Sequence, residues 1–193
     1  MEDDILESYM TRDRGLAFLK EKLNNANLVK HCLATEAFMR RLAERLGADP
    51  DDWGLVGLMH DVDLGEVGAD MNRHADVGAA WLAEKGMKPV LCEAVRKHNA
   101  EGLGLERLTV LDFALSSAET LTGLIVAAAL VMPDKKLSSV TSVNVLKRMK
   151  EKSFARGASR DIIKLCEKIG IPLEEFVSIG LTAMQGIAAE LGL

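Results

Sequence analysis

The sequence predicts an all-α protein, and three observations support this prediction. Apolar residues recur at spacings of three and four along most of the chain, which is the period of a helix with one buried face. Segments with the alternating pattern of strands are nearly absent, and only 4% of the residues are aromatic. With 193 residues and 48% hydrophobic content, the chain is long enough to enclose one sizeable core.

Helix start and stop signals divide the chain into successive helices. The first is expected from about Thr11 to Leu23, and the second from Asn27 as N-cap to Gly47. Asp49 as N-cap and Pro50 in the first turn predict the start of the third. A glycine-rich loop is expected over residues 65–70, and further helices over residues 72–86, 88–99 and 106–132.

The last third of the chain is expected to add helices to this core. Pro133 should end the long apolar helix, and a serine-rich polar segment follows it. Basic helices are expected near residues 143–154 and 160–169, and a final apolar helix over residues 172–191. We expect one domain over residues 1–193, made of a core over 25–132 and a helical extension over 133–193 packed on it.

The composition favours a cytoplasmic protein that does not associate with a membrane. Three scattered cysteines, none in a CxxC pair, suggest neither a disulfide framework nor a thiolate zinc site. The acidic start Met1–Asp4 argues against a signal peptide. The most apolar run, Leu121–Met132, has 12 residues, which is too short to span a bilayer and predicts a buried core helix.

Charge is distributed unevenly along the chain. The formal net charge of −5 argues against a stable complex with nucleic acid. Residues 135–168 nevertheless contain ten Lys or Arg and three Asp or Glu. This stretch is either a solvated helix face or a region that attracts an anionic substrate.

The four histidines of the chain fall on the expected inner faces of four different helices: His31, His60, His74 and His98. One histidine in such a place is usually an ordinary core residue, but four out of four favour a common ligand. Together with the carboxylates of Asp61 and Glu119, they could hold one or two divalent ions. This mixture of ligands suits Mn, Fe, Ni or Zn better than Ca, and Mg is also compatible with it.

The order of these residues resembles that of a known family. His31, the pair His60-Asp61 and a later acidic residue resemble the signature of the HD-domain superfamily of metal-dependent phosphohydrolases. His74 and His98 resemble the two extra histidines of its two-metal members. Three runs are similar to a bacterial group described as predicted HD-superfamily hydrolases, and this likeness covers residues 25–193: Trp53–Asp61, Leu121–Ala127 and Lys152–Arg156. The resemblance implies an HD-domain helical bundle with additional C-terminal helices.

The chain departs from the family at one ligand position. The family places an aspartate just before its Leu-Thr-Gly run, where this chain has Glu119. Asp112, seven residues earlier and nearly on the same helical face, is the competing candidate. We favour Glu119, because Asp112 is more simply explained as an acid in the first turn of the helix.

The resemblance implies a site for two metal ions and a hydrolytic reaction. His31, His60, Asp61 and Glu119 would hold one ion, His74 and His98 a second, and Asp61 would bridge them. The ions would activate water for attack on a phosphate ester. Asp63 would orient that water or a histidine ligand, or it is an exposed acid in a loop.

Lys152, Arg156 and Arg160 are the candidates for binding a small phosphorylated substrate. Their spacing of i, i+4 and i+8 lets all three point the same way on a helix, although a solvated basic face is equally compatible. Three other functions remain open: a di-iron HD-type oxygenase, a non-catalytic binding or signalling module and a purely structural metal site. A homodimer is expected on general grounds only.

Overall fold

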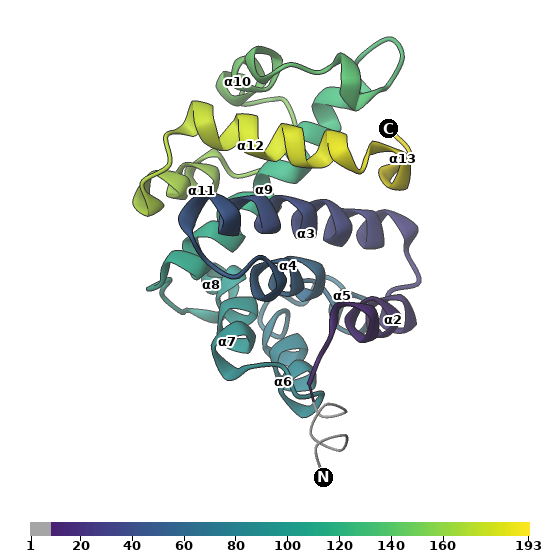
Figure 1. Cartoon of the computed structure of the whole chain (residues 1–193), viewed down its shortest axis with the longest axis vertical. Coiled ribbons are helices and arrows are strands. Elements are labelled where there is room, and N and C mark those ends of the chain that lie inside the picture. The colour runs from purple at the N-terminus through teal and green to yellow at the C-terminus, as the bar shows by residue number, and fades with distance from the viewer. Residues whose placement is uncertain (1–8) are drawn as a thin grey trace.

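The structure, a computed structural model, describes residues 9–193, so the acidic start Met1–Asp4 lies outside it. Within this range the chain forms α-helices and short 3₁₀ helices, and it contains no strand (Figure 1). The predicted all-α class is therefore confirmed. The helices surround one continuous cluster of buried apolar side chains.

The first two helices begin and end at residues that satisfy their free backbone groups. Helix α2 spans Arg12–Lys22, and the Thr11 side chain caps its start. Helix α3 spans Ala26–Leu46 and ends at Gly47, whose φ of 70° is the left-handed conformation that glycine adopts at low cost. The predicted cap at Asn27 is wrong, because the Asn25 side chain accepts the free N–H groups instead.

Helix α4, Pro50–Met59, crosses α3 at a very short distance, and glycine makes this possible. Asp49 caps α4, as predicted. A Cβ atom on Gly57 would lie 2.8 Å from the backbone oxygen of Thr35, closer than real Cβ atoms approach backbone. Since Thr35 lies one turn after His31, and Gly57 lies just before His60, this close crossing brings the first two histidines together.

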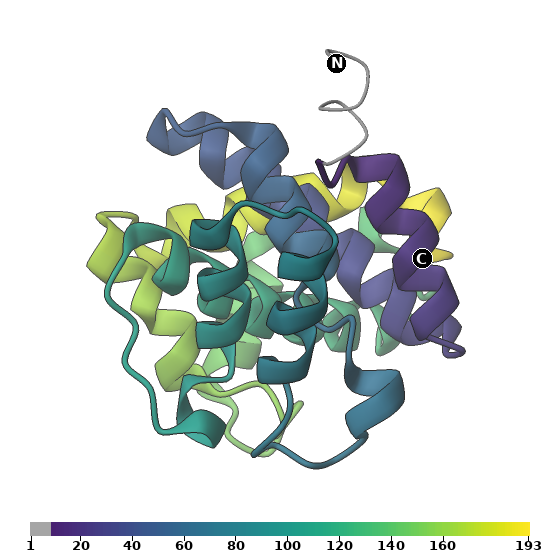
Figure 2. The ribbon, with the colours of Figure 1, turned by 90° about the horizontal axis from the view of Figure 1, so that it is seen from below.

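Two short and two longer helices lie between α4 and the central helix. Their bounds are α5 Leu64–Val67, α6 Asp76–Glu84, α7 Pro89–His98 and α8 Ala100–Leu103. Helices α6 and α7 pack side by side (Figure 2). The glycine-rich segment is thus not purely a loop, because it contains α5. The helix expected from Asn72 begins only at Asp76, so His74 lies in the turn before it.

Helix α9, Val110–Leu130, is the core helix of the molecule and packs against α3, α7 and α12. Thr109 and Asp112 form a reciprocal capping box at its start, four residues later than expected. By length and composition this helix could cross a membrane, which corrects the prediction that the apolar run is too short. However, 67% of its most apolar window is buried against the rest of the protein, as in a core helix.

The C-terminal segments cover the other side of α3 and α9. They are η1 Leu137–Ser139, α10 Ser142–Lys150, α11 Arg160–Ile163, η2 Lys164–Ile169, α12 Leu173–Gly186 and α13 Ala188–Leu191. Helix α12 lies along α3 and also contacts α9 (Figure 1). The predicted final helix is interrupted at Ile187, while Phe176 and Met184 of its apolar stripe are fully buried.

Candidate metal centre

Helices α3, α4 and α9 bring one group of candidate ligands together. The Nε2 atoms of His31 and His60 are 3.1 Å apart, although the residues are 29 positions apart in sequence. The Asp61 Oδ2 atom lies 3.5 Å from the first of these nitrogens and 3.3 Å from the second. Glu119 on α9 completes the group, because its carboxylate and the two imidazoles offer ligand atoms within 4.8 Å of one another.

A second group lies on the other side of Asp61. The Nε2 atoms of His74 and His98 are 3.0 Å apart. Asp61 Oδ1 lies 3.4 Å from each of these nitrogens, and all three residues are buried. The Asp61 carboxylate therefore stands between the two histidine pairs and turns one oxygen toward each.

The hydrogen bonds of the outer ring nitrogens fix the tautomers of two histidines. Nδ1 of His60 lies 2.8 Å from the backbone oxygen of Gly57, and Nδ1 of His98 lies 2.6 Å from that of Val95. A carbonyl oxygen only accepts hydrogen bonds, so both Nδ1 atoms must carry a proton and donate it. In the neutral ring, Nε2 is then left with its lone pair.

The same reasoning fixes the other two histidines. His74 Nδ1 donates to the carboxylate of Asp63 at 2.8 Å. The Thr122 hydroxyl donates its one hydrogen to the backbone oxygen of Glu119 at 2.7 Å, so it must accept from His31 Nδ1 at 3.1 Å. All four neutral imidazoles therefore point the lone pair of Nε2 into the centre of the cluster.

This arrangement fits a bound cation. Four nitrogen lone pairs and one carboxylate face one another with no N–H group between them, so neutral rings alone would leave the nitrogens in mutual repulsion. Imidazole and carboxylate ligands suit divalent transition metals. Each Nδ1 is held by a carboxylate, carbonyl or hydroxyl oxygen, which is the usual support for a histidine that binds metal through Nε2.

Without metal, protons take the place of cations in the two pairs. Burial lowers the pKa of His31 to about 4, while the charge of Asp61 outweighs burial and raises the pKa of His60. In the second pair, burial lowers the pKa of His98, and bonds to Asp61 and Asp63 raise that of His74 to about 9. Each pair therefore has one ring that readily holds a proton and one that does not.

The two carboxylates of the cluster differ in their surroundings. Burial would raise the pKa of Asp61, but the neighbouring His60, His74 and His98 hold it well below its usual range. Burial raises the pKa of Glu119 to about 7, and Thr120 Oγ1 lies 2.6 Å from its Oε1 atom. Asp61 is thus an anion at neutral pH even in the metal-free protein.

Asp63 is neither exposed nor directed at the centre. Its side chain is fully buried, and its Oδ2 atom accepts the N–H groups of Ala75 at 2.7 Å and Gly78 at 2.9 Å. Ala75 has a φ of 72°, which an alanine adopts only when its surroundings hold it there. Asp63 therefore fixes both the turn that carries His74 and the orientation of the His74 ring.

Asp112, the competing candidate for the last ligand, lies at the start of α9. Its carboxylate accepts the N–H groups of Leu108 and Thr109 and lies 3.6 Å from Lys97 Nζ. It belongs to neither group of candidate ligands among residues 9–193. The structure therefore places Glu119, and not Asp112, beside the first two histidines.

The three basic residues expected to bind phosphate do not share a helical face, because residues 151–159 form turns and no helix. The Arg160 guanidinium is bound to the loop itself, since its terminal nitrogens donate to the backbone oxygens of Phe154, Ala155 and Ala158, among others. Lys152 and Arg156 are exposed and line a neighbouring hollow of about 840 Å³.

The first group of ligands is reached from a hollow of about 400 Å³. His31, Glu119 and Gly123 line one side of it, and loop residues 155 and 157–159 line much of the other. His31 and Glu119 are half-buried, whereas Asp61, His74 and His98 are buried. A ligand in the hollow therefore meets the His31 group first.

Sequence reasoning missed the residues that hold the histidines in place. Thr122 fixes the tautomer of His31, and Asn99 Nδ2 donates to the backbone oxygen of His74 at 3.0 Å. Arg107 donates to the backbone oxygen of His98 at 2.7 Å and forms a bidentate ion pair with Glu101. The positions of two of these residues could have indicated their roles, because Asn99 directly follows His98 and Thr122 lies within the Leu-Thr-Gly run.

Comparisons with known proteins agree with this geometry. The family model of the HD domain matches residues 28–130, which is more than half of the chain. Ribonuclease Y from Opitutus terrae is 31% identical over 78 residues, and the matched region covers 40% of this chain and 15% of the ribonuclease. No solved structure matches the chain. HD domains are generally metal-dependent phosphohydrolases. Because the HD-domain family model matches the chain from α3 to α9, the chain belongs to the HD-domain family.

Proposed function

We propose that this protein is a metal-dependent phosphohydrolase that uses two divalent ions. The observation that carries the proposal is the convergence of four Nε2 lone pairs on the two oxygens of Asp61. His31, His60 and Glu119 would hold one ion, and His74 and His98 the other, with Asp61 between them. Such ions lower the pKa of a bound water and polarise a phosphoryl oxygen.

The surroundings of the site suit a phosphorylated substrate. Two divalent ions next to two carboxylates leave a net positive centre, which favours a phosphate group and the charge that grows on it during hydrolysis. The hollow beside His31 and Glu119 gives access to the first group, and the second is enclosed by protein. Asp61 would then keep both groups at a fixed separation, while Asp63 and Thr122 keep the rings oriented.

The test is hydrolysis of a panel of phosphate monoesters and diesters by untagged protein supplied with Mn, Fe, Ni, Zn or Mg. We expect metal-dependent release of phosphate or alcohol, lost in His60→Ala and retained in Asp112→Asn, whose carboxylate lies outside the cluster. Equal activity in His60→Ala and wild type would contradict the proposal. Oxygen consumption by the iron-loaded protein, without phosphatase activity, would instead support the oxygenase.

A second candidate substrate is a phosphodiester in RNA, and two observations favour it. The relative noted above is named a ribonuclease. In addition, the hollow lined by Lys150, Lys152, Arg156 and Lys164 shares Ala158 and Ser159 with the hollow beside the metal ligands. Cleavage of a short RNA oligomer, weakened by Lys152→Ala and Arg156→Ala together, would support this candidate, whereas hydrolysis of small esters alone would argue against it.

A further inference from the structure

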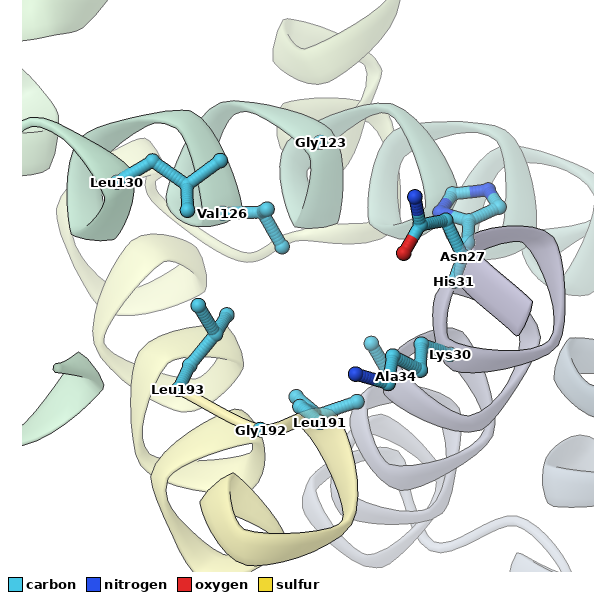
Figure 3. Close-up of a pocket in the computed structure, with 10 residues that line it drawn as sticks. All are labelled: Asn27, Lys30, His31, Ala34, Gly123, Val126, Leu130, Leu191, Gly192 and Leu193. Atoms are coloured by element: carbon cyan, nitrogen blue, oxygen red, sulfur yellow. The ribbon is translucent and has the colours of Figure 1, made fainter. Parts of the chain in front are cut away.

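A second pocket, of about 520 Å³, adjoins the candidate metal centre between α3, α9 and the last residues described (Figure 3). Its wall is mainly aliphatic, with Val126 and Leu130 from α9 and Leu191 facing them from the C-terminal segment. His31, a candidate metal ligand, also lines this pocket. A volume of this size is in the range of pockets that bury a small organic ligand.

Gly123 and His31 line both this pocket and the hollow beside the metal ligands, so the two hollows adjoin at these residues. Figure 3 places Gly123 on α9 between Val126 and His31. Glycine weakens a helix interior, yet nothing around Gly123 requires it, since a Cβ atom there would meet no atom within 4 Å. The missing side chain leaves free space where the two hollows adjoin.

We propose that the aliphatic pocket binds the alcohol part of the substrate and that this part is an apolar chain. Gly123 would keep open a passage between the pocket and the hollow beside the metal ligands. This inference rests on the proposed phosphohydrolase function, because the phosphate group would lie at the ligands while the chain extends past Gly123. No Phe, Tyr or Trp is among the ten residues described as lining the pocket, so it offers no stacking surface for a nucleobase.

Lys30 adds one positive charge to this mainly aliphatic wall, whose other polar side chains are Asn27 and His31. Its side chain extends from α3 into the pocket (Figure 3), and it forms no ion pair within residues 9–193. An ammonium group at the edge of an apolar pocket favours a ligand that is both apolar and anionic. An alkyl phosphate has this combination of properties.

The test is binding of methyl-, butyl- and octylphosphonate, which cannot be hydrolysed as esters, measured by calorimetry on the metal-loaded protein. Each methylene buried in the pocket should strengthen binding about three- to fourfold, so butylphosphonate should bind roughly 30-fold more tightly than methylphosphonate. The matching alkyl phosphates are then assayed for hydrolysis, where the same interactions should lower KM.

Three variants separate the parts of the proposal. Gly123→Leu should fill the passage and reduce the gain per methylene to less than twofold. Gly186→Leu is the matched control, because Gly186 is also an exposed helical glycine whose Cβ would meet nothing within 4 Å, but it is not among the pocket residues. Lys30→Met should weaken all three phosphonates by a similar factor and leave the gain per methylene unchanged.

The outcomes distinguish this inference from the proposed function. Hydrolysis of short esters with no effect of chain length on binding would overturn the pocket assignment and leave the hydrolase intact. A steep effect of chain length without hydrolysis of any ester would support the pocket and contradict the hydrolase. A chain-length effect that persists unchanged in Gly123→Leu would overturn the role of Gly123.

Discussion

Replacing Asp63 by asparagine should weaken one of the two proposed metal sites while leaving the fold intact. The backbone N–H groups of Ala75 and Gly78 can still bond to the amide oxygen that replaces Oδ2. The amide NH₂ group then replaces Oδ1, which lies 2.8 Å from His74 Nδ1. Because two donors would face each other, His74 must place its proton on Nε2, where it blocks metal binding.

The loss expected from such a change in the support of a ligand is about 10- to 100-fold in metal affinity. It corresponds to about 1.4 to 2.7 kcal/mol and should affect only the Asp61, His74 and His98 group. Metal titration by calorimetry of chelator-treated protein, together with elemental analysis, measures the effect. We expect two sites in the wild type and one tight site in Asp63→Asn.

Asp112→Asn is the matched control for this experiment. Asp112 is also buried and also accepts two backbone N–H groups, from Leu108 and Thr109, but it holds no histidine. Both variants should lose similar stability, on the order of 1 to 2 kcal/mol, because an amide oxygen accepts more weakly than a carboxylate. If Asp63→Asn keeps both sites at wild-type affinity, the tautomer argument is refuted.

Further predictions concern the support of the site. Arg160→Met should lower the free energy of unfolding by about 3 kcal/mol in urea titrations, since several partly buried loop carbonyls lose a charged donor, whereas exposed Arg156→Met should change it by less than about 0.5 kcal/mol. Gly57→Ala should cost about 1 to 3 kcal/mol, because the added Cβ meets the backbone of Thr35, and a neutral result would contradict the close crossing. Thr122→Val should weaken the first metal site about 10-fold in the same titration; unchanged affinity would argue against its role.

The inward placement of the histidines could be predicted because helix signals in this chain are strong and local. Asp49 and Pro50 fix the start of α4, so the helical period alone places His60 at its buried end. Gly47 fixes the end of α3 in the same way. The close contact of these two helices was not predictable, because it depends on which face Gly57 presents to Thr35.

The surroundings of His74 could not be read from the sequence. Ala75 adopts a positive φ of 72° that alanine disfavours, and the turn is stabilised by the buried carboxylate of Asp63, 12 residues earlier, and by Asn99, which donates to the backbone oxygen of His74. The start of α6 that local propensity predicted, at Asn72, is therefore four residues too early. The start of α3 was mispredicted by a smaller amount. Asn25 and Asn27 are both good N-cap residues, so the sequence alone does not decide which of them caps the helix.

The basic segment shows why a spacing alone does not define a surface. Lys152, Arg156 and Arg160 have helical spacing, but residues 151–159 form turns whose carbonyl oxygens are bound by Arg160. Nothing in the sequence of residues 151–159 indicates that the Arg160 side chain is needed to hold this loop. The function of the two exposed basic residues stays a prediction.

The most direct test of the two-ion centre is the number of metal ions per chain in untagged protein purified without chelator. Elemental analysis should find about two equivalents of transition metal in the wild type and none in the double variant His60→Ala, Asp61→Ala, which removes one imidazole and the central carboxylate. One equivalent, or none after reconstitution with Mn, Fe, Ni or Zn, would contradict the two-ion centre derived from the four converging imidazoles.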